Sequence, residues 1–334
     1  MKHKHPKHSR APSSRTFKKN HKPHLYAACG AVLVVGGIFT FMFYANPDMF
    51  ASTPKAPPLV TIATTTPLMT GPDAYTRLSL IGKSAIVYDL VTGETLYAQN
   101  VNASLPLASV TKLLTLYAAA NTLPGSAVIT MTPASVAEVN DAADAGFHEG
   151  ESFAFEDIAR LTLAASSNSG AEAIAEAADS AHTTDTTSLL AGAAASVGLT
   201  ATHASNGSGL DISSTVSGGY GSAHDVAVLA GALLKKAPLI AEATTQPRIS
   251  ITSLQGTTHT FVNTNIDVTH IPNPLLSKTG YTDLAGGNLV IVYDAAFNHP
   301  VAIVVLGSTE TGRFTDVQQL MNATLAHFAG IMPK

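Results

Sequence analysis

Three short motifs combine residue types that together can carry out acyl-transfer chemistry. They are Ser109-Val110-Thr111-Lys112, Ser166-Ser167-Asn168 and Lys278-Thr279-Gly280, in this order along the chain. A serine hydroxyl is a weak nucleophile until a base removes its proton. A lysine can be that base when burial or a neighbouring cation lowers its pKa. The first motif therefore offers a nucleophile with its base, and Lys278 of the third motif offers a neighbouring cation.

The spacing around Ser109 suits this pairing. The segment Ser109–Ala120 has the apolar periodicity of a helix that begins at Ser109. Residues at positions i and i+3 lie on one helical face, so Lys112 should point at the Ser109 hydroxyl. A second S-x-x-K sequence begins at Ser52, but it contains a proline and lies in a proline-rich stretch where no helix would pair its ends. We therefore expect Ser109 and Lys112 to be catalytic.

The second motif lies between two predicted helices, Phe155–Ala165 and Ala171–Ala178. A short loop at this point would present Ser166 as a proton relay and Asn168 as a hydrogen-bond donor and acceptor for a substrate amide. We expect both residues to be catalytic.

The third motif precedes a predicted strand, Gly287–Tyr293. An edge strand can pair with an extended peptide through main-chain hydrogen bonds, and a glycine lets that backbone approach closely. Lys278 and Thr279 can hold a carboxylate. We therefore expect a substrate-binding segment made of Lys278, Thr279, Gly280 and Tyr281.

Three other matches to known motifs fail on inspection. Gly82-Lys83-Ser84 resembles a phosphate loop but lacks its first glycine, and His148-Glu149 lacks the second histidine of a zinc protease. The segment Asn206-Gly207-Ser208-Gly209 lacks the frame of a nucleophile elbow. The remaining histidines of the predicted exported part have no partner at ligand spacing, and the five histidines of residues 1–24 lie in a tail with no packing to fix ligand geometry. We therefore expect neither a metal nor a cofactor.

The helices and strands that we predict around these motifs are arranged in blocks along the chain. Two strands come first, then many helices, then further strands and a closing helix. Beyond those named above, we predict strands at Ser84–Leu90, Thr95–Asn100, Ile249–Leu254 and Val301–Leu306, and helices at Ser222–Lys236 and Asp316–Ala329. This order favours a mixed α/β layer fold with a largely antiparallel sheet.

The N-terminal region differs in composition from the rest of the chain. Residues 1–24 hold eight basic residues and no acidic one. A basic arm alone could indicate nucleic acid, but residues 25–45 then run without a charge over 21 positions. At about 1.5 Å per residue, that run crosses a hydrocarbon layer of about 30 Å. Basic residues on one flank place that flank in the cytoplasm.

We therefore predict four segments: a basic cytoplasmic tail at 1–24, a transmembrane helix at 25–45, a proline- and threonine-rich linker at 46–77, and a catalytic domain at 78–334. The protein would be a single-pass membrane protein with its catalytic domain outside and no nucleic-acid partner. A cleaved signal peptide is the competing interpretation. Its apolar core is usually shorter, about 7–15 residues, and no A-x-A-like site follows Ala45.

The three motifs in this order resemble those of low-molecular-mass penicillin-binding proteins of the D-alanyl-D-alanine carboxypeptidase family. The resemblance extends to SAIVYDLVTGETLYAQN, PLASVTKLLT and KTGYTDLAGGNLV. It implies a β-lactamase/transpeptidase-like fold, in which helices flank an antiparallel sheet and form an all-helical subdomain. It also implies a serine enzyme without cofactor that acts on stem peptides of peptidoglycan ending in D-Ala-D-Ala and binds β-lactam antibiotics, with an oxyanion hole formed by the backbone N–H groups of Ser109 and Tyr281.

Three alternatives to a carboxypeptidase remain. A D,D-endopeptidase that cuts cross-links has the same motifs. A class A β-lactamase would need a glutamate some 35 residues after the second motif, and the sequence has none between Glu176 and Glu242. A catalytically silent wall-binding module would not need the complete set of reactive groups. One departure from the family is Ser169, where many members have aspartate; it affects the expected specificity rather than the chemistry.

Overall fold

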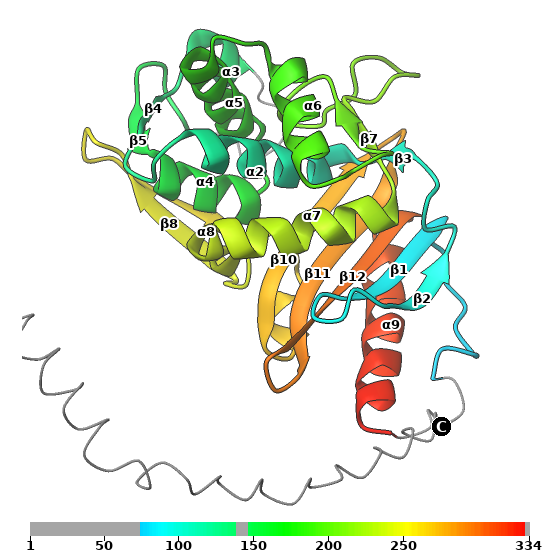
Figure 1. The fold of residues 1–334 in the computed structure, drawn as a ribbon. Helices are drawn as coiled ribbons and strands as arrows, with labels where there is room; N and C mark the ends of the chain where they lie inside the picture. Colours follow the sequence, from blue (N-terminus) through cyan, green and yellow to red (C-terminus); the bar gives the residue numbers. More distant parts are fainter. Residues whose placement is uncertain (1–73, 138–145, 331–334) are drawn as a thin grey trace, which may run out of the picture. The chain divides into compact units, whose positions relative to one another are not determined.

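A five-stranded antiparallel sheet forms the centre of the domain (Figure 1). The protein is described by a computed structural model that covers residues 74–137 and 146–330. The strands lie in the order β10-β11-β12-β1-β2. Their bounds are β10 Pro274–Thr282, β11 Gly286–Ala296, β12 His299–Ser308, β1 Ser84–Asp89 and β2 Thr95–Gln99. The predicted mixed α/β fold with a largely antiparallel sheet is confirmed.

Strands β11 and β12 are largely buried on both faces, which explains why they are almost continuously apolar. Val290 and Val292 of β11 pack into one core, whereas Leu289 and Ile291 pack into another. This alternation follows from the two-residue period of a strand. Helix α7 (Ala223–Lys236) covers the first face, and α9 (Gly312–Phe328) covers the second (Figure 1).

A group of helices packs beside the sheet and supports the first two motifs. It consists of α2 (Lys112–Thr122), α3 (Pro133–Ala137), α4 (Phe155–Ala164), α5 (Asn168–His182) and α6 (Thr186–Ser196), with α8 (Pro238–Ala243) below them. Its core combines large apolar side chains, such as Leu113, Phe153 and Ile158, with many alanines, so the helices pack closely.

The expectation of an all-helical subdomain needs correction. Short strands interrupt the helices: β4 (Val128–Thr130) pairs with β5 (Ser152–Ala154), β8 (Arg248–Thr252) pairs with β9 (Thr258–Val262), and β7 (Gly219–Gly221) lies between β3 (Leu105–Pro106) and β6 (His203–Ala204). The pairs satisfy the backbone groups of these connecting segments, and β4 and β8 alternate between buried and exposed residues. Strand β8 overlaps the predicted strand Ile249–Leu254, whereas the other short strands were not predicted, because runs of two to five residues carry little periodicity.

The N-terminal segments predicted from the sequence lie outside the described residues. Within the described ranges, no helix has the length and apolar character needed to cross a membrane. Packing of the domain includes residues before the predicted start at 78, because Ala74 and Tyr75 are buried and the Tyr75 hydroxyl donates to Thr324 Oγ1 at 3.1 Å.

Candidate active site

The nucleophile candidate lies just before helix α2, on a turn of 3-10 helix, η2 (Ala108–Thr111). The α-helix itself begins at Lys112, so the prediction that it begins at Ser109 is wrong by one turn. The tighter turn still places the two side chains together: Lys112 Nζ lies 2.7 Å from Ser109 Oγ. The predicted pairing of these two residues is therefore present, with a different local geometry.

Lys112 is completely buried and contacts three oxygen atoms. Besides Ser109 Oγ, its Nζ lies 2.7 Å from Asn168 Oδ1 and 2.9 Å from the Ser208 carbonyl oxygen. A neutral amine has two N–H donors and one lone pair. Asn168 and Ser208 can accept the two donors, which directs the lone pair at the Ser109 hydroxyl. The arrangement thus suits a base that takes the proton of Ser109.

Ser208 belongs to the segment Asn206–Gly209, which the sequence analysis set aside. Its carbonyl faces Lys112, and its N–H donates to Glu172 Oε1 of α5 at 2.9 Å. Gly209 has φ +77°, and a Cβ there would lie 2.1 Å from the Ala108 carbonyl oxygen. The segment therefore packs directly against the nucleophile turn. The sequence contains no signal for this role, because a backbone carbonyl is supplied by any residue type.

The second motif connects α4 to α5. Ser167 is the N-cap of α5 and its hydroxyl accepts from the Gly170 N–H at 2.9 Å. Ser166 has a left-handed backbone, φ +65°, which is uncommon for a residue with a side chain. This conformation places Ser166 Oγ 2.8 Å from Lys278 Nζ, while Asn168, at the start of α5, reaches Lys112. Ser166 and Ser167 occupy the predicted loop.

The third motif lies on β10, which is an edge strand of the large sheet. Lys278 is 1% exposed and donates to Ser166 Oγ at 2.8 Å and to the Thr279 carbonyl at 2.7 Å. Thr279 Oγ1 donates to Thr264 Oγ1 at 2.6 Å. The second and third motifs therefore meet through the contact between Ser166 and Lys278.

Gly280 allows β10 to approach the nucleophile turn. A Cβ at this position would lie 2.8 Å from the Leu107 carbonyl oxygen and 3.2 Å from Val110 N and Cγ2. Asn288 on β11 strengthens the same contact, because its Nδ2 lies 3.0 Å from the carbonyl oxygens of both Pro106 and Leu107. The glycine is thus required by the protein's own packing.

A buried arginine holds the outer end of the third motif. Arg313 Nη1 donates to the Gly280 carbonyl at 2.8 Å, and its guanidinium lies 4.9 Å from the centre of the Phe314 ring. Burial lowers the pKa of Arg313, but a guanidinium stays protonated in proteins. The next residue of the strand, Tyr281, is 47% exposed and can contact a bound peptide. Neither Arg313 nor Asn288 was predicted as part of the site.

Within residues 74–137 and 146–330, no group of three or more His, Cys, Asp or Glu side chains is arranged to hold a metal ion. The arrangement is instead a serine with a buried lysine, a second serine with a second buried lysine, and an open strand edge.

These features form a site in which a buried lysine can activate a serine for acyl transfer, and comparison with known proteins identifies the family. The model of the D-alanyl-D-alanine carboxypeptidase family matches residues 72–310, so the chain belongs to this family and the resemblance seen in the sequence is confirmed. D-alanyl-D-alanine carboxypeptidase DacB2 of Mycobacterium tuberculosis is 30% identical over 201 residues, which are 60% of this chain and 66% of that protein, slightly less than two thirds of its length.

Two solved structures show the same architecture. Penicillin-binding protein D2 of Listeria monocytogenes, in its ampicillin-bound form, is 25% identical, with a TM-score of 0.63 over 74% of this chain and 98% of that chain. The D-alanyl-D-alanine carboxypeptidase of Mycobacterium tuberculosis H37Rv is 25% identical, with a TM-score of 0.64 over 77% and 94% of the two chains. The fold is therefore that of low-molecular-mass penicillin-binding proteins.

Proposed function

We propose that the protein is a serine-type D-Ala-D-Ala carboxypeptidase that acts on peptidoglycan stem peptides through an acyl-enzyme on Ser109. The single observation that carries this proposal is the contact of one buried amine, Lys112 Nζ, with Ser109 Oγ and Asn168 Oδ1, both at 2.7 Å. The family match and the named relative support the same activity. A D,D-endopeptidase would use the same site. The two activities differ in the leaving group, which is D-alanine for the carboxypeptidase and a stem peptide for the endopeptidase.

In the acylation step, Lys112 takes the proton of Ser109 while Oγ attacks the carbonyl carbon of the penultimate D-alanine. The backbone N–H groups of Ser109 and Tyr281 stabilise the oxyanion. The C–N bond then breaks, and an ester bond to Ser109 Oγ remains.

The leaving D-alanine needs a proton on its amine and a partner for its carboxylate. Ser166 relays to the amine the proton that Lys112 took from Ser109, so that Lys112 becomes neutral again, and Lys278, 2.8 Å away, holds the Ser166 oxygen during this transfer. Lys278 and Thr279 bind the carboxylate, and the free edge of β10 pairs with the peptide backbone.

Water then hydrolyses the ester, which releases the shortened peptide and restores the Ser109 hydroxyl. Penicillin carries an equivalent amide and carboxylate and acylates the same oxygen. Because the chain has no glutamate between Glu176 and Glu242, it lacks the residue that class A β-lactamases use for rapid deacylation. We therefore expect a penicilloyl-enzyme that persists for many minutes.

The test is the substitution Ser109→Ala, compared with Ser180→Ala, whose exposed hydroxyl only contacts the carbonyl of Glu176 in its own helix. The Ser109 variant should neither bind fluorescent penicillin covalently nor release D-alanine from a pentapeptide ending in D-Ala-D-Ala. The Ser180 variant should do both. Covalent labelling of the Ser109 variant would refute the assignment. If the unmodified protein separates a cross-linked stem-peptide dimer but releases no D-alanine from the pentapeptide, the endopeptidase would be favoured.

We further propose that residues 25–45 anchor the protein in the membrane, with residues 1–24 in the cytoplasm. The charge asymmetry and the apolar length support this topology. An intact N-terminus recovered from the membrane fraction is the expected result. A mature protein that begins between Ala45 and Ala56 and is found free outside the cell would mean that the apolar run is a signal peptide.

A further inference from the structure

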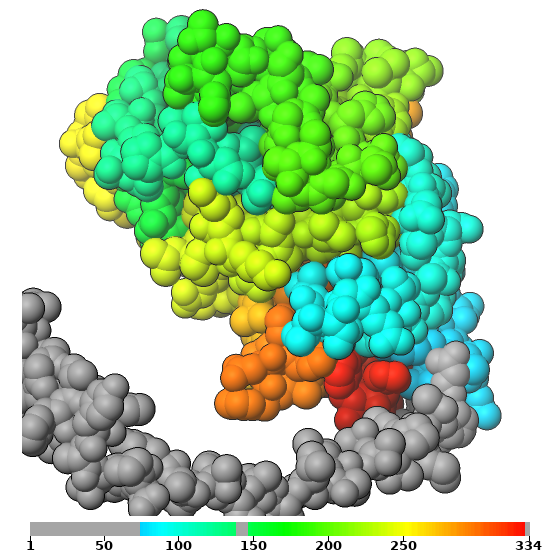
Figure 2. Space-filling view, viewed as in Figure 1, coloured from blue at the N-terminus to red at the C-terminus, as the bar shows by residue number. Residues whose placement is uncertain are grey.

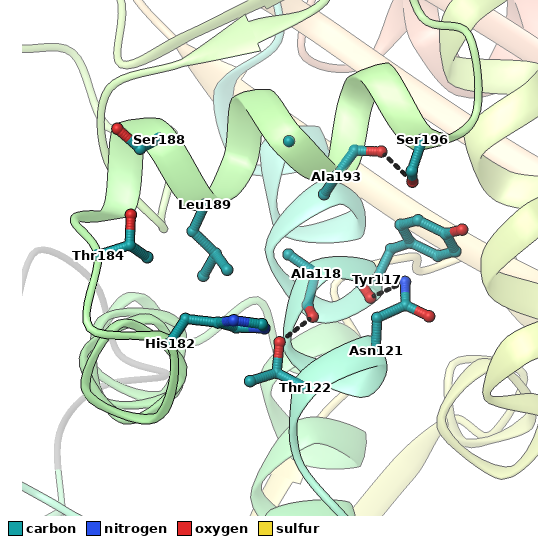
Figure 3. A pocket seen from close by; sticks show the side chains of 11 residues that line it. Tyr117, Ala118, Asn121, Thr122, His182, Thr184, Ser188, Leu189, Ala193 and Ser196 are labelled. Atoms are coloured by element: carbon teal, nitrogen blue, oxygen red, sulfur yellow. Dashed lines mark hydrogen bonds between the residues drawn. The ribbon is translucent and has the colours of Figure 1, made fainter.

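A groove on the helical side of the domain lies apart from the residues of the candidate active site. It runs between the second half of α2 and the length of α6, and the segment after α5 closes one end (Figure 3). Its volume is about 480 Å³, which lies in the range of ligand sites. In Figure 2, the teal surface of α2 is visible beside the green α6, so this side of the groove opens to solvent.

The lining of the groove is neutral and amphipathic. None of its eleven residues is Asp, Glu, Lys or Arg. Small or aliphatic side chains, including Ala118, Leu189 and Ala193, form an apolar strip along its middle (Figure 3). Tyr117 lies at one end and His182 at the other, as Figure 3 shows. The lining offers a charged ligand no carboxylate, lysine or arginine, whereas a neutral ligand with one apolar face fits the strip.

Polar atoms surround the apolar strip, and several keep oxygen atoms available. Asn121 Nδ2 donates to the Tyr117 carbonyl at 3.0 Å, and Thr122 Oγ1 donates to the Ala118 carbonyl at 3.0 Å. Each of these groups retains acceptor capacity. Among the described residues, no hydrogen bond involves the Tyr117 hydroxyl. The groove thus offers several acceptors, a hydroxyl donor and an aromatic edge around a nonpolar surface.

From these properties we infer that the groove binds neutral N-acetylated sugar units of the peptidoglycan glycan strand. A sugar ring has a face of C–H bonds and a rim of hydroxyl and acetamido groups, which matches an apolar strip within a polar rim. The inference rests on the proposed function, because the glycan strand is part of the same polymer as the stem peptide.

The position of the groove is consistent with this use. Helix α2 begins at Lys112 in the active site and ends at Thr122 in the groove. With a rise of about 1.5 Å per residue, these ends lie about 15 Å apart. Four residues of an extended stem peptide span about 13 Å. The distance from the groove to the active site is thus similar to the length of a stem peptide that would link a glycan strand in the groove to the bond cleaved at Ser109.

Gly192 provides a direct test. It lies on α6 in the lining, and a Cβ there would meet no atom within 4 Å. The substitution Gly192→Phe should therefore fill the groove without displacing the helix, whereas Gly192→Ala is the matched control that leaves the groove open. Tyr117→Phe is a second variant, which removes only the hydroxyl.

The probe is the N-acetylglucosamine tetrasaccharide, titrated into the full chain in detergent. We expect binding to the unmodified protein and to Gly192→Ala, weakened about tenfold or more by Gly192→Phe and less strongly by Tyr117→Phe. Hydrolysis of a free pentapeptide should be the same in all four proteins, and hydrolysis of glycan-linked stems should fall in Gly192→Phe.

Equal tetrasaccharide binding by the unmodified protein and Gly192→Phe, or no binding by the unmodified protein, would overturn the inference. The proposed function has a separate readout, because hydrolysis of the free pentapeptide does not require the groove. A protein that hydrolyses the pentapeptide but ignores the tetrasaccharide would therefore retain the proposed function and lose only the glycan site.

Discussion

The two buried lysines of the site are held in different ways. Lys112 lies between helices, and its three oxygen partners come from the nucleophile turn, α5 and the segment around Ser208. Lys278 lies on an edge strand, and its partners are Ser166 and the carbonyl of its own neighbour Thr279. The first lysine is thus fixed from all sides, whereas the second depends on the position of a strand with one free edge.

This difference separates two tasks. A base must keep its lone pair on one hydroxyl, so it benefits from a rigid cage. The proposed role of Lys278 is with the substrate, and the strand that carries it must stay free to pair with the peptide. Near its C-terminal end, the strand is positioned by the close approach of Gly280 and by Arg313, and further back Ser277 is held by Thr244 and Asn265. No neighbouring strand among the described residues holds its outer side.

The largest expected effect comes from removing the amine of Lys112. Lys112→Met keeps the length of the side chain but removes the base, so acylation by fluorescent penicillin should slow by about 10³-fold. Lys235→Met changes an exposed lysine at the end of α7 and should leave the rate unchanged. Acylation of the Lys112 variant at the original rate would mean that another group deprotonates Ser109.

A smaller effect is expected when the strand is moved rather than the base. In Gly280→Ala, the new methyl group would lie 2.8 Å from the Leu107 carbonyl oxygen, so β10 must move away from the nucleophile turn. Misplacement by a fraction of an ångström to one ångström should lower kcat/KM on the pentapeptide by about 100-fold. Gly192→Ala, where the methyl group meets open space, is the control. Similar activities for the two alanine variants would contradict a tight contact at Gly280.

The same contrast shows what the sequence can and cannot predict. The pair Ser109 and Lys112 is local, so spacing alone placed the two side chains together, even though the turn is 3-10 rather than α-helical. The strand Gly287–Tyr293 was predicted because its apolar run is long enough to be recognised. Contacts made by the Ser208 carbonyl, Asn288 and Arg313 depend on segments that meet only after folding, and none of these residues has a local pattern that indicates its role.

Arg313 tests the difference between the two lysines further, because it contacts strand β10, which carries Lys278, and not the groups around Lys112. Arg313→Lys removes the planar guanidinium that contacts both the Gly280 carbonyl and the Phe314 ring, and an ammonium does not make both contacts equally well. We expect KM for the pentapeptide to rise by about tenfold, with kcat changed much less, since Lys112 is untouched. Arg248→Lys, at an exposed arginine of β8, should change neither constant. A loss confined to kcat would assign Arg313 to the chemical step instead.

The smallest expected effect on activity is at a buried, hydrogen-bonded pair outside the three motifs. Glu151 Oε1 lies 2.7 Å from His259 Nε2, and both side chains are almost completely buried. Burial raises the pKa of Glu151, but the hydrogen bond with His259 and further hydrogen bonds outweigh burial, and the net pKa is lowered. A lowered pKa in the folded state means that the carboxylate stabilises the fold above its ordinary titration range, and that this stability is lost as the pH falls through the folded-state value.

Glu151→Gln should therefore lower Tm at neutral pH by roughly 3 °C, as expected for about 1 kcal/mol in a domain of this size. The difference from the unmodified protein should shrink as the pH falls below about 4, where both states of the unmodified protein become protonated. Glu149→Gln, at an exposed neighbour, should show no such pH dependence. Pentapeptide hydrolysis at neutral pH should be nearly unchanged, because Glu151 precedes β5 and His259 lies on β9, outside the three motifs. A Tm difference that stays constant from neutral to acid pH would show that the carboxylate charge of Glu151 does not contribute to stability.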